Sequence, residues 1–349
     1  MEKVAKLWRA DGDRVVCTAC ARMCRIPNGS HGFCFVRQNR NGRLVLVNYG
    51  VIEVMQIDPI EKKPFNHFMP NSYVLGIGTS SCNWGCSFCQ NHNISKEREV
   101  KGNEFTPKEI VEKALKENVQ GIAYTYNEPT IFAEFALDVA KEAKRNGLFN
   151  VFVTNGYMTP ETVSEMSGVI DAAVVNIKGN AERLFANKYE MVLSNKPVME
   201  SLVRLKDVGI HIEITDLVIP GVGDSLEACA NLCSWISDML GKETPLHFTR
   251  FHPDYKMVDY PATPIETLVK HRDIAIRSGL EFVYIGNAPY IEGENTYCPK
   301  CKSLCVGRDN YAITSWNLDS ANACVGCGHK IPIVGSPVKT RRRKISVLF

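Results

Sequence analysis

No apolar stretch in the 349-residue sequence approaches the length of about 18 residues that a membrane-spanning helix requires, so we expect no membrane span. The first residues, Met1–Lys6, lack an apolar core of signal-peptide length, and this absence favours a cytoplasmic protein. An excess of one charge is also missing, because the formal net charge is only +3, and we expect no nucleic-acid partner. The one basic run, Lys339–Lys344, is interpreted as a solvated terminal segment.

Cysteine, by contrast, is abundant: the chain contains 14. Twelve of them fall into three clusters whose spacing is typical of metal ligands, unlike the scatter of a secreted disulfide framework. The remaining two, Cys229 and Cys233, lie four residues apart on an expected helix and are interpreted as core thiols. Without a secretion signal, this pattern indicates bound metal in a reducing compartment.

The most informative cluster is Cys82, Cys86 and Cys89, with the spacing C-x3-C-x2-C. Three thiolates close together can bind three irons of a 4Fe–4S cluster and leave the fourth iron open to a substrate or cofactor. A zinc knuckle or free thiols are the alternatives. Structural zinc sites use four protein ligands, and the nearest candidate for a fourth, His92, would need an unusual loop.

The other two clusters also predict metal sites. Zinc is our first interpretation of the C-terminal cluster, two C-x2-C pairs with 22 residues between them, and Cys305 is a spare thiol that would suit an iron–sulfur cluster instead. For the N-terminal cluster, zinc is preferred over iron, and an auxiliary iron–sulfur cluster also fits. The C-terminal ligands are Cys298, Cys301, Cys324 and Cys327, and the N-terminal ligands are Cys17, Cys20, Cys24 and Cys34.

Between these clusters, apolar runs of strand length alternate with helical patterns, which predicts an α/β fold with a parallel sheet. About six such units indicate a partial, open (β/α)6 barrel related to the TIM barrel, with its site at the carboxyl ends of the strands. The expected strands are Tyr73–Gly78, Ile122–Tyr126, Val151–Thr154, Ala172–Ile177, Ile210–Ile219, Leu246–Phe251 and Phe282–Ile285.

Four parts of the chain are therefore expected. They are a cysteine-rich segment with a hairpin (1–69), the barrel (70–290), a zinc-ribbon-like module (291–335) and the basic tail (336–349). The turn Asn41-Gly42 predicts the hairpin, and Asp58–Pro64, with two prolines, is interpreted as a linker. Capping boxes at Thr106 and Thr263 predict two helix starts.

The run Thr79–Asn91 resembles the signature of the radical S-adenosylmethionine (SAM) superfamily. The resemblance implies that the open iron binds SAM through its amino and carboxylate groups. Reduction of the cluster, by a partner such as ferredoxin or flavodoxin, then cleaves SAM to methionine and a 5′-deoxyadenosyl radical.

Within this superfamily, the chain resembles the radical SAM member of the AmmeMemoRadiSam system, a branch similar to pyruvate formate-lyase activating enzymes. The segments that carry this resemblance are Asp58–Pro64, Cys89–Asn91, Tyr126–Pro129, Arg250–Tyr255, Gly286–Asn287 and Thr296–Cys301.

The resemblance also implies where SAM binds. Asn127 and Glu128 follow the second expected strand, where superfamily members carry polar residues that meet the methionine amino group. Lys178 matches a lysine that meets the SAM carboxylate in the activating enzymes, which commonly have aspartate where this chain has Asn176. Further candidates follow or line the neighbouring strands. They are Thr154, Asn155, Glu213, Thr215 and His247, with His252 as a weaker choice.

Our interpretation is a radical SAM enzyme that abstracts hydrogen from an unidentified substrate. The activating-enzyme resemblance favours a protein substrate, and a small molecule stays open. The alternatives are a non-catalytic iron–sulfur or zinc protein, against which the expected barrel mouth argues, and an RNA-modifying enzyme, for which the basic tail argues.

Overall fold

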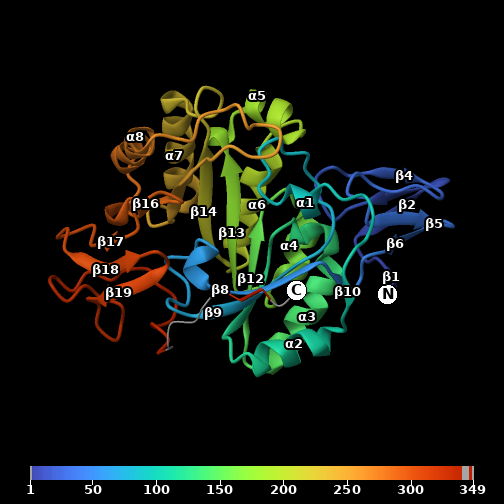
Figure 1. Ribbon diagram of the computed structural model, residues 1–349, viewed down its shortest axis with the longest axis horizontal. Coiled ribbons are helices and arrows are strands. Elements are labelled where there is room, and N and C mark those ends of the chain that lie inside the picture. The colour runs from blue at the N-terminus through green and yellow to red at the C-terminus, as the bar shows by residue number, and fades with distance from the viewer. Residues whose placement is uncertain (1, 340–345, 348–349) are drawn as a thin grey trace.

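Nine strands form the central sheet of the protein, whose computed structural model describes residues 2–339 and 346–347 (Figure 1). Their order across the sheet is β16-β15-β14-β13-β12-β11-β9-β8-β20. The strands are β8 (Val54–Pro59), β9 (Tyr73–Gly78), β11 (Gly121–Tyr124), β12 (Phe149–Thr154), β13 (Ala172–Lys178), β14 (His211–Val218), β15 (Leu246–Arg250), β16 (Val283–Gly286) and β20 (Ser346–Val347).

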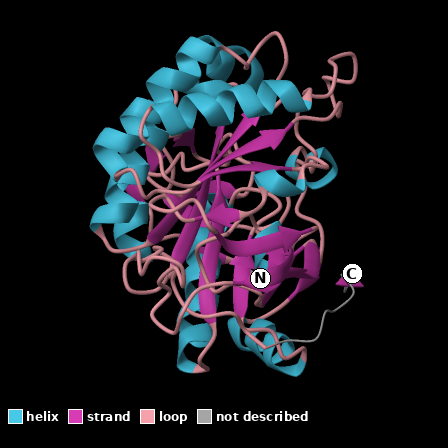
Figure 2. Cartoon of the chain, turned by 90° about the vertical axis from the view of Figure 1, so that its left-hand side faces the viewer, coloured by secondary structure: helices cyan, strands magenta, loops and turns pink. Residues whose placement is uncertain are grey.

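Every neighbouring pair from β9 to β16 is parallel, so a helical connection returns the chain after each strand. Figure 2 shows these helices outside the curved sheet. The longer ones are α2 (Pro107–Lys116), α3 (Ala133–Arg145), α4 (Pro160–Met166), α6 (Lys196–Asp207), α7 (Leu226–Leu240) and α8 (Ile265–Arg277). Since β16 and β20 end the strand order, the described sheet is an open barrel, as the sequence predicts.

All seven apolar runs that predict strands form strands, within a few residues at each end. The physical reason is burial on both faces. Every residue of β9 and β11 is buried, and apolar side chains from the sheet and from α2, α3 and α7 form one large core. Cys229 and Cys233 lie fully buried in that core, which confirms their interpretation as core thiols.

Shorter elements join these units. The helical turns are η1 (Ile60–Lys62), α1 (His92–Ser95), η2 (Pro129–Phe132), η3 (Gly179–Ala181), α5 (Arg183–Phe185), η4 (Ala186–Glu190) and η5 (Ile291–Gly293). Of the two predicted capping boxes, only the one at Thr106 forms. A helix, α8, does begin at Ile265, but the predicted capping box was wrong, because the Thr263 hydroxyl donates to the Val218 carbonyl instead.

The interpretation of Asp58–Pro64 as a linker was also wrong. Val54–Pro59 is β8, which pairs antiparallel with β9 inside the central sheet. The carboxylate of Asp58 is fully buried and bonds Lys62 at 2.8 Å and Lys63 at 2.7 Å. Burial alone would raise the pKa of Asp58, but the two ammonium groups outweigh it and hold that pKa below its usual range. The segment is therefore a structural part of the barrel.

The N-terminal segment forms two three-stranded sheets at one side of the barrel (Figure 1). Their strands are β1 (Lys3–Val4), β2 (Trp8–Asp11), β3 (Arg14–Cys17), β4 (Arg25–Pro27), β5 (Arg37–Arg40) and β6 (Arg43–Leu46). Asn41 and Gly42 have φ of 53° and 78°, so the predicted hairpin turn joins β5 and β6. Two short strands, β7 (Val51–Ile52) and β10 (Asn103–Glu104), pair beside it.

At the opposite side, the C-terminal module is a three-stranded antiparallel sheet of β17 (Thr296–Tyr297), β18 (Leu304–Asp309) and β19 (Ala312–Trp316). Of the predicted basic tail (336–349), residues 340–345 and 348–349 lie outside the described residues. Within the described part of the chain, no helix combines the length and the apolar character that crossing a membrane requires.

Candidate active site

The three cysteines Cys82, Cys86 and Cys89 lie on the loop between β9 and α1, at the carboxyl end of the first parallel strand. Backbone hydrogen bonds fix this loop from two sides. Ser81 donates to the Ile94 carbonyl at 2.8 Å, and Gly85 donates to the Glu190 carbonyl at 3.0 Å. A Cβ at Gly85 would come 2.3 Å from the Met191 sulfur, so the loop approaches that segment as closely as glycine allows.

Asn127 holds the start of this loop. Its amide Nδ2 donates to the Ser81 carbonyl at 2.8 Å and to the Thr79 hydroxyl at 3.0 Å, and its Oδ1 accepts from the Thr79 backbone at 3.1 Å. Ser81 has a φ of 75°, a conformation that a non-glycine residue adopts only when its surroundings enforce it. Asn127 is therefore at least a positioning residue for Cys82, the next residue along the chain.

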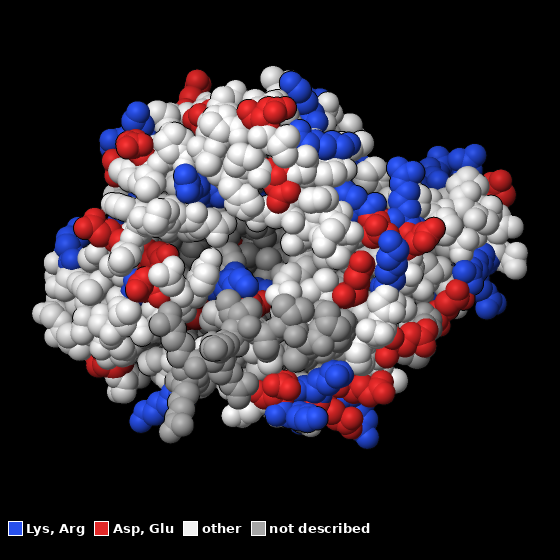
Figure 3. Space-filling model, in the orientation of Figure 1, with Lys and Arg blue, Asp and Glu red and all other residues white. Residues whose placement is uncertain are grey.

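All three cysteines line a cavity of about 340 Å³ at the carboxyl ends of the strands. Figure 3 shows a hollow near the centre of the face that is turned toward the viewer. Eight of the nine residues predicted to hold the cofactor line the cavity with the cysteines: Asn127, Glu128, Thr154, Asn155, Asn176, Lys178, Thr215 and His247. The strand-by-strand prediction thus brought together residues that lie far apart in the sequence.

Glu128 joins the ends of β11 and β12. Its carboxylate accepts from the Thr154 hydroxyl at 2.7 Å, from the Asn155 backbone at 2.7 Å and from both the backbone and the hydroxyl of Thr130. Burial raises the pKa of Glu128 against these hydrogen bonds. The Asn155 amide in turn donates to the Asn83 side chain at 2.8 Å, which links this network to the cysteine loop.

Lys178 points toward the cysteine side of the cavity. Its ammonium donates to Oδ1 of Asn176 at 3.1 Å, and the same oxygen accepts from the Thr215 hydroxyl at 2.8 Å. Burial lowers the pKa of Lys178. Nearby, burial raises the pKa of Glu190 to about 8. A carboxylate-bearing ligand in this cavity would find Lys178 as a cationic donor.

Glu213 is the one predicted cofactor residue that does not line the cavity. Its carboxylate is fully buried below the cavity and accepts from the Asn66 and His67 backbones and from the side chains of His211 and His247. Burial alone would raise the pKa of Glu213, but the histidine hydrogen bonds hold it well below its usual range. Contact with SAM is therefore not supported for Glu213, which the sequence placed among the cofactor-binding candidates.

The remaining histidine candidates differ in position. His247 lines the cavity and stacks on Tyr284, with ring centroids 4.9 Å apart. His252 is exposed and bonds Gln90 at 2.8 Å, beside the cavity rather than in it. His92, the conceivable fourth zinc ligand, faces the Cys89 carbonyl and stacks on Tyr255 at 4.8 Å.

The three thiols fit a cationic cluster. Burial raises the pKa of Cys82 to about 12 and that of Cys86 well above its usual value. Such thiols become thiolates only when a metal compensates their charge. Among the described residues, one group alone has its ligand atoms all within 4.8 Å of one another, and it is not this triad. The triad thus lacks the compact spacing of a one-ion site, and three thiolates suit a cluster of several irons.

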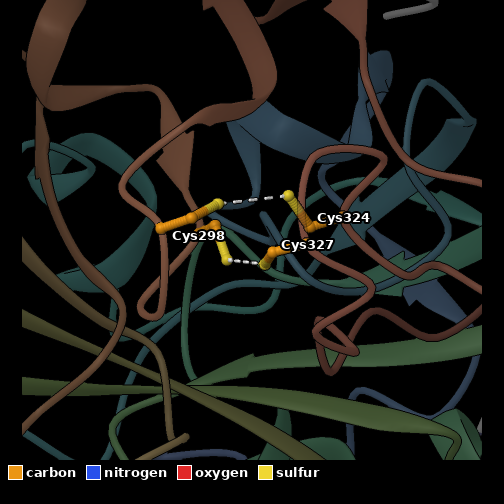
Figure 4. Close-up of side chains that lie close together, drawn as sticks. Cys298, Cys324 and Cys327 are labelled. Atoms are coloured by element: carbon orange, nitrogen blue, oxygen red, sulfur yellow. Dashed lines mark hydrogen bonds between the residues drawn. The ribbon is translucent and has the colours of Figure 1, made fainter.

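The group with the compact spacing is the C-terminal one, Cys298, Cys301, Cys324 and Cys327. Two sulfur pairs, Cys298 with Cys327 and Cys301 with Cys324, lie 3.6 Å apart (Figure 4). The spare thiol, Cys305, is buried but lies outside this group. These residues can hold one metal ion, as the sequence predicts.

Several residues of the cavity were not among the site residues predicted from the sequence. Tyr126, with a φ of 71°, donates its hydroxyl to Asp58 at 3.0 Å, and Ser95 lies 3.0 Å from the Cys89 sulfur. Arg308 reaches the cavity from the C-terminal module, although its guanidinium donates to the Thr296 hydroxyl and to the Glu294 and Asn66 carbonyls. A pattern of apolar runs does not predict such contacts, because they depend on how loops, α1 and the C-terminal module pack at the mouth of the barrel.

The sequence of this chain is similar to those of several known proteins. The family described as the Radical SAM superfamily matches residues 77–233. The chain is 44% identical over 329 residues to "Uncharacterized protein MJ0808" of Methanocaldococcus jannaschii, covering 93% of this chain and 97% of that protein. It is 21% identical over 199 residues to the pyruvate formate-lyase-activating enzyme of Clostridium pasteurianum, covering 52% of this chain and 81% of that enzyme.

Among solved structures, SuiB of Streptococcus suis bound to S-adenosylmethionine aligns with a TM-score of 0.50. The identity is 13%, and the alignment covers 69% of this chain and 56% of that one, which shows a likeness of fold. The chain belongs to the radical SAM superfamily, with pyruvate formate-lyase activating enzymes among its relatives. The resemblance read from the cysteine triad is thus confirmed at the level of the superfamily.

Proposed function

We propose that this protein is a radical SAM enzyme of the activating-enzyme type, which takes hydrogen from a protein substrate. The observation that carries the proposal is that Cys82, Cys86 and Cys89 line one cavity with polar side chains from four successive strands. When bound and reduced, a 4Fe–4S cluster supplies the electron that cleaves SAM to methionine and a 5′-deoxyadenosyl radical. An electron-carrier protein such as ferredoxin or flavodoxin is the proposed reductant, in the cytoplasm.

The residues of this chain would act as follows. Three thiolates hold the cluster, and Asn127 fixes the loop that presents them. Lys178 binds the SAM carboxylate, with Asn176 and Thr215 orienting its ammonium. Glu128, Thr154 and Asn155 keep the second and third strand ends together around the methionine part of SAM. The protein substrate is suggested by the relative of C. pasteurianum, which is an activating enzyme.

Replacing each cysteine of the triad by alanine tests the chemistry. In anaerobically reconstituted protein with SAM and dithionite, Cys82→Ala, Cys86→Ala and Cys89→Ala should each abolish 5′-deoxyadenosine formation. Cys233→Ala, which removes a buried thiol of α7, is the matched control and should keep it. Formation of 5′-deoxyadenosine at the control rate in any triad variant would refute the cluster assignment.

The role of Lys178 is tested by SAM binding to the reconstituted protein. Lys178→Met should weaken SAM binding about ten-fold or more, because a hydrogen bond to a charged group is lost. Lys188→Met removes an exposed lysine of the nearby η4 and should leave the affinity unchanged. Equal affinities of the two variants would exclude Lys178 as the carboxylate ligand.

The class of substrate is tested with labelled extract from cells grown in deuterated medium. The extract is separated into macromolecular and dialysable fractions, and each is incubated with enzyme and unlabelled SAM. We expect deuterium in 5′-deoxyadenosine only with the macromolecular fraction. Transfer from the dialysable fraction alone would replace the protein substrate with a small molecule.

The C-terminal module is proposed to hold zinc. A tetrahedral zinc–thiolate site places its sulfurs about 3.8 Å apart, and the two pairs at 3.6 Å are close to that value. Metal analysis should give about one zinc per chain, lost in Cys298→Ser.

A further inference from the structure

The four N-terminal cysteines surround a second cavity. Cys17 ends β3, Cys20 and Cys24 lie on the loop between β3 and β4, and Cys34 precedes β5. All four line one small enclosed space, together with Arg37 and Ile131. Three of these thiols, those of Cys17, Cys20 and Cys34, are almost completely enclosed by protein. The four thiols thus surround one space, as the ligands of a single metal centre do.

Their spacing differs from that of the C-terminal site. A single tetrahedral ion needs four sulfurs within about 4 Å of one another, whether it is zinc or mononuclear iron. The C-terminal cysteines meet this requirement. Across the described residues, no three of the N-terminal thiols lie within 4.8 Å of one another, and no sulfur–sulfur hydrogen bond joins any two of them.

The cysteine triad of the active site is a second site in the same chain with which the spacing of the N-terminal sulfurs can be compared. Its sulfurs are also outside the 4.8 Å limit in the described structure, and they belong to the signature that holds a 4Fe–4S cluster. The wide spacing has a simple cause. In a four-iron cluster each cysteine binds a different iron, so the thiolates stand at the corners of a larger body than one ion.

We propose that Cys17, Cys20, Cys24 and Cys34 hold a second, fully ligated 4Fe–4S cluster rather than zinc. As in the triad, no three of the four sulfurs lie within 4.8 Å of one another, and all four line the same cavity. The proposal is independent of the radical SAM chemistry, because it concerns a different set of ligands. It replaces the preference for zinc at this site, which rested on sequence spacing alone.

The surroundings of the second site connect it to the first. Asn83, the residue after Cys82, forms part of the wall of the N-terminal cavity. Arg22, which lies over the ring of Phe33 at 3.6 Å, donates its Nε to the Asn83 carbonyl and its Nη2 to the Met191 carbonyl at 2.6 Å. The two metal sites are therefore neighbours that share one stretch of backbone.

The loop that carries these cysteines is also part of the barrel rather than a loose appendage. Ala21 donates to the Tyr157 carbonyl at 3.0 Å, and the hydroxyls of Thr159 and Thr162 donate to the carbonyls of Thr18 and Ala19. Tyr157, Thr159 and Thr162, around the start of α4, therefore fix the backbone on either side of Cys20.

The test uses the full chain with the triad removed, Cys82→Ala/Cys86→Ala/Cys89→Ala, purified and reconstituted with iron and sulfide without oxygen. We expect about four iron and about four sulfide per chain, with the visible absorption of an iron–sulfur cluster, and about one zinc from the C-terminal site. Two zinc ions and no sulfide per chain would overturn the proposal. Failure of the wild-type enzyme to cleave SAM would not affect this result.

A second variant checks the ligands. Adding Cys20→Ser and Cys34→Ser to the triad-free chain should remove the iron and sulfide, whereas adding Cys229→Ser and Cys233→Ser, which replaces two core thiols of α7, should retain them. Circular dichroism shows whether both proteins fold. An iron–sulfur signal that survives in the folded Cys20/Cys34 variant would exclude these cysteines as ligands.

Discussion

Oε2 of Glu213 in β14 accepts a hydrogen bond from Nε2 of His247 in β15, at 2.7 Å, in a site where both side chains are buried. His211 and the backbones of Asn66 and His67 donate to the same carboxylate. One carboxylate below the cavity therefore joins two barrel strands to the segment before β9.

Glu213→Gln should destabilise the protein, because the new amide cannot accept all four hydrogen bonds and leaves buried donors unpaired. The expected loss is about 1–3 kcal/mol for each such donor. Chemical denaturation measures it. Glu243→Gln, the same change at an exposed position, is the control and should have little effect. Equal stability of the two variants would show that the Glu213 carboxylate does not stabilise the fold.

Arg37 and Glu134 form a buried ion pair between the N-terminal segment and α3, with Nη2 and Oε2 2.5 Å apart. Glu134→Gln should cost about 3–5 kcal/mol, because it leaves a guanidinium buried without its partner. Glu142→Gln, on the same helix, breaks the surface pair with Arg145 and should cost about 1 kcal/mol or less. Denaturation curves compare the two, and the prediction fails if Glu142→Gln is the more damaging change.

The carboxyl of Glu61 gives a pH-dependent prediction. Burial raises its pKa to about 7, against a hydrogen bond from the Asn71 backbone. An acid whose pKa is raised in the folded state stabilises the fold most at low pH, and this contribution is lost as the pH rises from about 4 through 7.

Glu61→Gln should therefore be more stable than the wild type at pH 8, by about 3 kcal/mol, and equally stable near pH 4. The amide keeps the shape of the protonated acid and carries no charge to bury. Urea denaturation at several pH values measures the difference. A constant difference across this range would mean that Glu61 does not titrate in the folded protein.

Gly78 ends β9 just before the cysteine loop, and a Cβ there would lie 2.8 Å from the Thr125 carbonyl oxygen. Gly78→Ala should therefore cost about 1–3 kcal/mol, because backbone must move. In Gly286→Ala, at the end of β16, the added carbon meets Thr249 at an ordinary 3.6 Å, so the expected cost is much smaller. Thermal unfolding of both variants tests the contrast, and equal costs would contradict it.

Much of the fold could be predicted because its signals are local. Strands β9 and β13 are near-continuous apolar runs, and the Thr106 capping box lies within one turn of helix. The exception is instructive. Asp58 is charged and is followed by two prolines and two lysines, so the end of β8 resembled a linker. The pairs with Lys62 and Lys63 make the burial of Asp58 in a strand favourable.

The candidate site was predictable where residues follow strand ends. Asn176, Lys178 and Thr215 belong to successive parallel strands, whose carboxyl ends meet at one edge of the sheet. Glu213, in the same strand as Thr215, was also a cofactor candidate, but hydrogen bonds from Asn66, His67 and His247 enclose its carboxylate. Arg308, from a separate module, carried no signal in the sequence at all.

By itself, the sequence determined the number of thiols and their order along the chain, which is enough to predict three metal-binding clusters and to identify the radical SAM signature. Only the tertiary structure decided how far apart the sulfur atoms stand. Ligand spacing along the chain limits the greatest distance between two sulfurs, whereas helix α4 and the barrel set the actual one. That distance distinguishes a site for one ion from a site for a cluster.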